Sequence, residues 1–254
     1  MRVTRCISFL TLLIVGLSAT AGASPINLGS YSTLLPGLID FENLTANNYD
    51  VTTRSGLATF SEHFLGQTVT FTNDLYLTPH DVLSGSPGNP LTLEDGAANK
   101  NLEVVSFGSN VLAGLGDLAF GDLNASGEGA MSILFDFDQS SLGFELLGAD
   151  GTDSSLSRGL SGQLRLDFFR RDGSLIDTVY LQDPVDGFYG FDRDLGLKDI
   201  AGVSVSNTDF GGLGIDNIRH DVISASEPTS ILLLGPSLFG LAFAVRRKIQ
   251  LRGR

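Results

Sequence analysis

The sequence predicts an all-β protein whose body is a two-sheet antiparallel β-sandwich. Apolar and polar residues alternate with a period of two in several short segments, such as residues 131–138, 164–168 and 203–206. Clusters of Gly, Ser, Asn, Asp and Pro separate such segments, as in residues 84–90. Helical periodicity is nearly absent from the body. Short strands with one apolar face and frequent turns are typical of two packed antiparallel sheets.

The N-terminus has the three parts of a signal peptide. Arg2 and Arg5 precede an apolar stretch, residues 7–17, and the small residues Ala21 and Ala23 then form a small-x-small cleavage site. We expect cleavage after Ala23, so that residues 1–23 are removed. The next residues, 24–38, show no clear pattern and are expected to form an irregular leader.

The body is strongly acidic. Nine of the 16 Lys and Arg residues and all 29 Asp and Glu residues lie between the two terminal segments, which gives the body a formal charge of about −20. Nucleic acid is therefore excluded as a partner, because binding it requires a basic face. Two alternatives remain for this charge: binding of divalent cations, or solubility alone.

We expect one β-sandwich domain over residues 39–221. The strongest local prediction is a hairpin, in which residues 164–170 and 175–181 pair across the turn formed by Asp172 and Gly173. Cys6, the only cysteine, is removed with the signal peptide. Disulfides and thiolate chemistry are thereby excluded from the mature body.

The C-terminus contains three consecutive segments of different composition. A linker, residues 222–228, ends in the motif Ser226, Glu227 and Pro228. An uncharged apolar run follows over residues 229–245, and it would span roughly 25 Å as a helix, the lower limit for crossing a bilayer. Five basic residues then lie in the tail, residues 246–254. We predict one transmembrane helix with a cytoplasmic tail, which places the body outside the cytoplasm.

This arrangement resembles the PEP-CTERM sorting signal of exported bacterial proteins, with Ser226 at the position where the family motif has proline. The resemblance implies an exosortase-type membrane protease as a partner. It also implies an exported protein that begins as an inner-membrane-anchored precursor and ends at the cell surface or outside the cell. An ordinary C-terminal anchor and a buried core helix are the alternatives.

The ends of the body, residues 39–44 and 213–221, resemble the opening and closing strands of jelly-roll carbohydrate-binding modules. That resemblance implies a jelly-roll sandwich in which these two strands lie side by side. It also implies a structural Ca²⁺ ion held by Glu42 and Asp216, with Asp40 as a further ligand. The alternative is that these carboxylates are solvated side chains on the strand faces.

The function that we expect is a non-enzymatic surface or matrix protein associated with exopolysaccharide. The loop formed by residues 187–191 is the predicted ligand contact, because its glycines would leave Phe188, Tyr189 and Phe191 exposed. The alternative for these aromatic residues is that they belong to the core.

Catalytic motifs are absent from the sequence. The three histidines, His63, His80 and His220, lack the spacing of a zinc site and are expected at the surface, and there is no Gly-x-Ser-x-Gly elbow. The alternative function is a secreted glycoside hydrolase or polysaccharide lyase with two catalytic carboxylates. The sequence does not select that pair among the 29 acidic residues.

Overall fold

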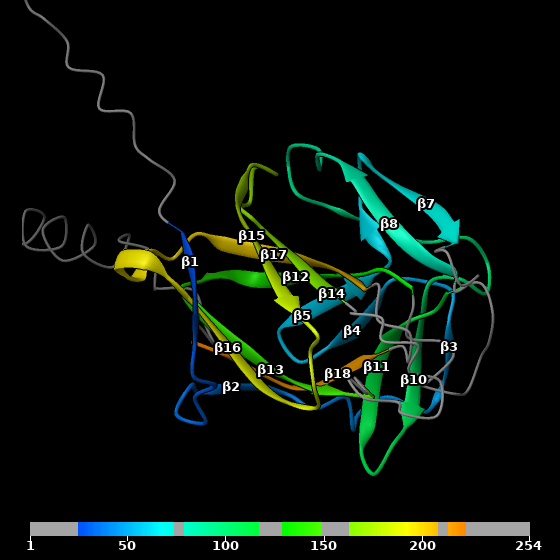
Figure 1. Ribbon diagram of the computed structural model, residues 1–254, viewed down its shortest axis with the longest axis horizontal. Helices are drawn as coiled ribbons and strands as arrows, with labels where there is room; N and C mark the ends of the chain where they lie inside the picture. Colours follow the sequence, from blue (N-terminus) through cyan, green and yellow to red (C-terminus); the bar gives the residue numbers. More distant parts are fainter. Residues whose placement is uncertain (1–24, 74–78, 117–128, 149–162, 208–212, 222–254) are drawn as a thin grey trace, which may run out of the picture.

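The computed structural model describes residues 25–73, 79–116, 129–148, 163–207 and 213–221, and these ranges are all-β. All strand pairings within the sheets are antiparallel, and two large sheets face each other across the core (Figure 1). The only helical turn in these ranges is a 3₁₀ turn, Asp194–Gly196. The predicted all-β body of antiparallel sheets is therefore confirmed.

The first sheet has eight strands in the order β1-β16-β13-β18-β11-β10-β3, with β2 paired to β18. We call it sheet A. The bounds of its strands are β1 Ile26–Gly29, β2 Gly37–Ile39, β3 Asn47–Tyr49, β10 Leu102–Ser106, β11 Asn110–Gly114, β13 Ser141–Leu147, β16 Gly187–Arg193 and β18 Gly214–His220.

The second sheet, sheet B, has six strands in the order β15-β14-β17-β12-β5-β4, and two small two-stranded sheets accompany it. Its strands are β4 Thr53–Ser55, β5 Ala58–Ser61, β12 Met131–Gln139, β14 Gln163–Phe169, β15 Leu175–Gln182 and β17 Ile200–Asn207. The small sheets pair β6 His63–Phe64 with β9 Leu93–Glu94, and β7 Gln67–Asn73 with β8 Pro79–Gly85.

The core lies between sheets A and B and consists of the inward residues of both. On sheet B, Phe60, Ile133 and Phe168 are buried, and on sheet A, Phe144 and Phe191 meet them. The Phe168 and Phe191 ring centroids lie 5.4 Å apart. Because successive strand residues point to opposite faces, the period-two pattern of the sequence fills this space from both sides.

The outer face of sheet B is covered by the β7–β8 hairpin, which lies above the sandwich in Figure 1. The alternation pattern predicts a solvated face at Ser132 and Ser204, but both are buried. Their hydroxyls lie 2.9 Å apart, and Ser204 donates to Gln67 Oε1 over 3.1 Å. The prediction failed here because another layer covers the polar face, and the hydroxyls satisfy one another beneath it.

The predicted hairpin is confirmed. Strands β14 and β15 pair with Leu164 opposite Leu181, and Gly173 in the turn has φ +80°. This conformation is accessible to glycine at little cost, which explains the Asp-Gly turn.

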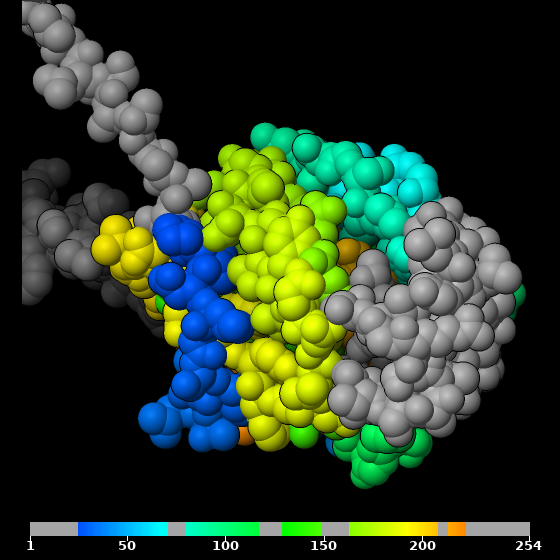
Figure 2. All heavy atoms as spheres, in the orientation of Figure 1, coloured from blue at the N-terminus to red at the C-terminus, as the bar shows by residue number. Residues whose placement is uncertain are grey.

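The predicted irregular leader is wrong in part, because it contains β1 and most of β2. Ile26 is buried, and its N–H donates to Asp177 Oδ2 on β15 over 2.8 Å, so β1 joins the edge of sheet A to the edge of sheet B. In the space-filling view β1 (blue) lies beside the yellow-green surface of β15 (Figure 2). Residues 25–29 thus close one side of the sandwich.

The opening and closing strands lie side by side, as the jelly-roll resemblance implies. Ile39 on β2 pairs with Ile218 on β18. The opening strand is shorter and earlier than predicted, because Phe41 has φ 56° and the chain turns there, with Leu44 N–H donating to the Phe41 carbonyl over 2.9 Å.

Candidate functional site

The three aromatic residues predicted to contact a ligand lie on strand β16 and not in a loop. Phe188 is 56% exposed, whereas Phe191 is fully buried in the core. Tyr189 is half-buried against the core, and its hydroxyl donates to the Val185 carbonyl over 2.9 Å. The strand alternation explains this difference, because Tyr189 and Phe191 point inward while Phe188 points outward. Phe191 offers no free ring face, so its predicted role is corrected to core packing.

On the outer face of sheet A, Phe188 packs against an aromatic residue from the segment that connects β1 to β2. The ring centroids of Tyr31 and Phe188 lie 4.7 Å apart, and the Tyr31 hydroxyl donates to the Asn217 carbonyl over 2.9 Å. A Cβ at Gly143 would lie 2.8 Å from the Tyr31 ring, so glycine there lets the ring approach the sheet. We call Tyr31 and Phe188 the aromatic pair.

Polar side chains lie next to the aromatic pair. Glu145 is the cross-strand neighbour of Phe188, and Asn217 Nδ2 donates to Glu145 Oε2 over 2.7 Å. Both side chains are half-buried. An exposed ring beside a fixed carboxylate and amide offers stacking and hydrogen bonding to the same ligand, a combination suited to a sugar ring.

The three predicted calcium ligands do not form one group. Asp216 is buried, and its carboxylate accepts from Ser109 Oγ over 2.7 Å and from Asn217 N–H over 2.6 Å. Glu42 is exposed, and its Oε1 atom accepts from Asn110 N–H over 3.0 Å. Among the described residues, no three His, Cys, Asp or Glu side chains are placed to hold a metal ion. Calcium at Glu42 and Asp216, with Asp40 as a further ligand, therefore stays a prediction of the resemblance.

The environment of Asp216 is nevertheless unusual. Burial raises the pKa of this carboxyl, while hydrogen bonds from Ser109 and Asn217 oppose the shift and the nearby carboxylates of Glu145 and Asp40 add to it. Asp216 lies where β18 changes its partner from β11 to β2, and Asn217 has φ 48° at this point.

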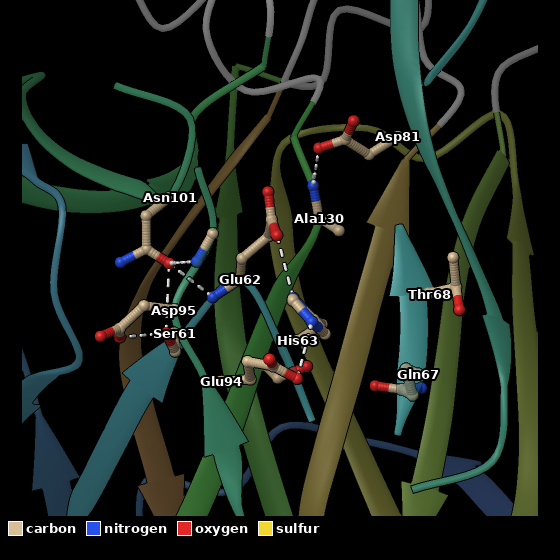
Figure 3. Close-up of polar contacts among 12 residues, drawn as sticks. Ser61, Glu62, His63, Gln67, Thr68, Asp81, Glu94, Asp95, Asn101 and Ala130 are labelled. Carbon is tan, nitrogen blue, oxygen red and sulfur yellow. Dashed lines mark hydrogen bonds and ion pairs between the residues drawn. The ribbon is translucent and has the colours of Figure 1, made fainter. Parts of the chain in front are cut away.

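A cleft of about 400 Å³ lies between the β7–β8 hairpin and the β6–β9 pair, and Figure 3 shows polar side chains that line it. Its lining is mostly polar, and it brings together segments that are far apart in the sequence. The lining residues are Glu62, His63, Gln67, Thr68, Val69, Asp81, Glu94, Asp95, Gly96, Ala97 and Lys100. We call this the acidic cleft.

His63 lies between two carboxylates in the acidic cleft. Its Nδ1 atom lies 2.9 Å from Glu62 Oε2, and its Nε2 atom lies 3.4 Å from Glu94 Oε2. The hydrogen bond to Glu62 raises the pKa of His63, burial opposes this, and the charges of Glu62 and Glu94 add to the rise. The imidazole is therefore more readily protonated than a free histidine.

Asn101 fixes the position of Glu62 and of the loop opposite it. Its Oδ1 atom accepts from Ser61 Oγ over 3.1 Å, from Glu62 N–H over 2.8 Å and from Gly96 N–H over 3.1 Å. Its Nδ2 atom donates to the Tyr49 carbonyl over 2.8 Å. Figure 3 shows the three bonds from Ser61, Glu62 and Gly96 converging on the Asn101 amide oxygen. Asn101 is fully buried.

Sequence reasoning did not identify the acidic cleft. His63 was expected at the surface, but its side chain is only 12% exposed. His220 was expected at the surface too, but it is 1% exposed, with its ring centroid 5.9 Å from that of Phe135. The available signal was two short polar groups, Glu62-His63 and Glu94-Asp95, within turn-rich sequence. Nothing in their spacing shows that they meet.

No protein-family model matches this chain, and no curated protein shows significant similarity to it. The predicted cleavage site at Ala21 and Ala23 and the predicted sorting motif, Ser226, Glu227 and Pro228, lie outside the described residues. The predicted membrane span, residues 229–245, also lies outside them. Within the described part of the chain, no helix has the length and apolar character of a membrane span.

Proposed function

We propose that this chain is an exported surface or matrix protein that associates with exopolysaccharide without cleaving it. The order of its segments supports export, because a signal peptide precedes the body and a PEP-CTERM-type motif, an apolar run and a basic tail follow it. In this proposal an exosortase-type protease processes the inner-membrane-anchored precursor, and the body reaches the cell surface or the medium.

The observation that carries the polysaccharide contact is the aromatic pair. Phe188 remains 56% exposed although it packs against Tyr31, and Glu145 lies directly across the strand from it. Exposed apolar rings cost free energy in water, and one held beside a fixed carboxylate and amide is suited to a partly apolar, hydroxyl-rich ligand. The net negative charge of the body disfavours nucleic acid as an alternative polymer.

The proposal includes the jelly-roll form of the sandwich. The adjacency of β2 and β18 supports it, since β2 ends at Ile39, where the jelly-roll resemblance begins, and β18 lies within the closing segment of that resemblance, residues 213–221. Calcium at Glu42, Asp216 and Asp40 stays a prediction of the resemblance, and its test is whether EDTA lowers the Tm of the purified protein.

The test of the proposed function uses the full-length protein, purified in detergent, and the exopolysaccharide of the producing bacterium. We expect the protein to co-sediment with the polysaccharide and to generate no new reducing ends. Failure to co-sediment would overturn the proposal. Cell fractionation checks export: a chain found in the cytosol with both ends uncut would contradict it.

The second candidate is a glycoside hydrolase or polysaccharide lyase, and the acidic cleft is the observation that favours it. Glu62 and Glu94 lie on opposite sides of the His63 ring, and glycosidases use two carboxylates around the scissile bond. New reducing ends, or new unsaturated ends, that disappear in Glu94→Gln would establish this function in place of the first.

A further inference from the structure

The turn that follows β16 carries its leucines outward and its charges inward. Leu195 is 82% exposed and Leu197 is 43% exposed, although both side chains are large and apolar. At the base of the same turn the Arg193 side chain is only 1% exposed, and it donates to Asp199 through Nε over 2.7 Å and through Nη2 over 3.1 Å. Buried charges beneath exposed leucines reverse the usual distribution at a protein surface. We call residues 194–198 the leucine turn.

The leucine turn is held in a defined shape. Arg193 and Asp199 flank it, so their ion pair closes its base. Within it, the Leu195 N–H donates to Asp194 Oδ1 over 3.0 Å and the Leu197 N–H donates to the Asp194 carbonyl over 3.4 Å. Because these two N–H groups are already paired, moving the leucines out of water leaves fewer backbone groups to desolvate.

The leucine turn lies at the end of the sandwich where the described chain begins and ends. The carboxylate of Asp221, the last described residue, accepts from the Ser140 N–H over 2.9 Å, and the Ser140 carbonyl accepts from the Arg193 N–H over 2.8 Å. The Asp194 N–H donates to the carbonyl of Pro25, the first described residue, over 3.2 Å. Figure 1 shows the turn (yellow) beside the start of β1 (blue).

The predicted membrane span begins a short distance along the chain from this end. Residues 222–228 separate Asp221 from Thr229, and even a fully extended chain of this length spans at most about 30 Å. The leucine turn is therefore tethered near the lipid whenever residues 229–245 are inserted. Tethering raises the effective concentration of the lipid surface, so that even a weak contact is populated.

We propose that the leucine turn docks on the lipid surface that anchors this chain, with Leu195 and Leu197 at the boundary between headgroups and acyl chains. Lys198 is exposed beside them and stays at the level of the headgroups, where its ammonium group meets lipid phosphate. The inference rests on the membrane-anchored precursor of the proposed function. It goes beyond that function by assigning the face of the body that meets the membrane.

The test uses one introduced indole, because the chain has no tryptophan of its own. The full-length Leu197→Trp protein is placed in vesicles of phosphatidylethanolamine and phosphatidylglycerol. We expect its emission to shift to the blue and to be quenched by lipids brominated on their acyl chains. The emission of a water-exposed indole would overturn the inference. A blue shift without quenching would indicate burial against protein, such as a second copy of the chain, and would overturn it too.

Val185→Trp is the matched control. Val185 is 55% exposed in the loop before β16, whereas the leucine turn follows that strand. A strand of seven residues spans about 20 Å, so the control indole lies away from the lipid when the turn is docked. We expect no blue shift and little quenching at this position. Equal quenching at positions 185 and 197 would contradict the assigned orientation.

A second variant tests the contribution of Leu195. Leu195 has φ 57°, a conformation that asparagine adopts more readily than leucine, so Leu195→Asn should keep the fold and the Tm. Added to Leu197→Trp, it should lower the ratio of docked to undocked protein by about tenfold, because it removes an apolar side chain from the lipid contact. Unchanged quenching would contradict a role for Leu195.

The inference and the proposed function fail in different ways. Flotation with vesicles after an alkaline carbonate wash shows whether the chain is inserted. An inserted chain whose indole at position 197 stays in water loses the inference and retains the membrane-anchored precursor. A chain that does not insert loses both the precursor and the inference, whereas co-sedimentation with exopolysaccharide is measured independently of either.

Discussion

His63 Nδ1 lies 2.9 Å from Glu62 Oε2, and this contact connects the stability of the protein to pH. The folded state raises the pKa of His63, chiefly through that hydrogen bond. A raised folded pKa adds stability that is fully present below the unfolded value of about 6.5 and is lost as pH rises through the folded pKa.

We predict that His63→Gln removes this pH dependence. The free energy of unfolding of the wild type should fall as pH rises above about 6.5, and the variant should show a smaller fall over the same window. Urea unfolding at a series of pH values measures the free energy of unfolding of the wild type and of the variant. Identical pH profiles would show that the Glu62–His63 pair does not contribute.

Asn101→Ala should be strongly destabilising. The variant leaves the Glu62 and Gly96 N–H groups without their acceptor, and removing an acceptor from buried donors costs about 1–3 kcal/mol each. We expect a loss of about 2–4 kcal/mol in urea unfolding. Asn27→Ala, at an exposed position on β1, serves as the control and should change little. A loss below about 1 kcal/mol for Asn101→Ala would contradict its role as the central acceptor.

Asp216→Asn should be at least as stable as the wild type at neutral pH. Burial raises the folded pKa of Asp216, so wild-type stability falls as pH rises from about 4 through that folded pKa. The amide keeps an oxygen for the bond from Ser109 or Asn217 and carries no charge. Thermal unfolding at pH 7 and below pH 4 checks this. A variant that is less stable at pH 7 and equal at low pH would instead indicate that the ionised carboxylate is stabilised in the protein, for instance by a bound cation.

Local pattern predicted the strands with clear alternation, such as β12, β14 and β17, but it missed β1 and β16 and did not predict the layers that cover the strands. The β14–β15 hairpin follows from alternation and the turn residues alone, because its two strands are close in sequence and pair directly across the turn. Ser132 and Ser204 alternate correctly, yet they are buried beneath the β7–β8 hairpin. The alternation of a strand specifies two faces, but it carries no information on what covers the polar one.

The candidate sites were predictable only in part for the same reason. Phe188, Tyr189 and Phe191 were predicted as ligand contacts from the glycines around them, and the strand position leaves only Phe188 facing outward. Tyr31 joins it from a segment expected to be irregular. The acidic cleft depends on contacts among residues 62–63, 94–96 and 101, which only the folded chain brings together.

The most direct test of the polysaccharide association compares Phe188→Ala with Phe107→Ala in the full-length protein. Both phenylalanines are about half exposed, but Phe107 lies in the β10–β11 turn and is not part of the aromatic pair. We predict that Phe188→Ala reduces co-sedimentation with exopolysaccharide by about tenfold at unchanged Tm, and that Phe107→Ala binds like the wild type. Equal binding by the two variants would contradict the account.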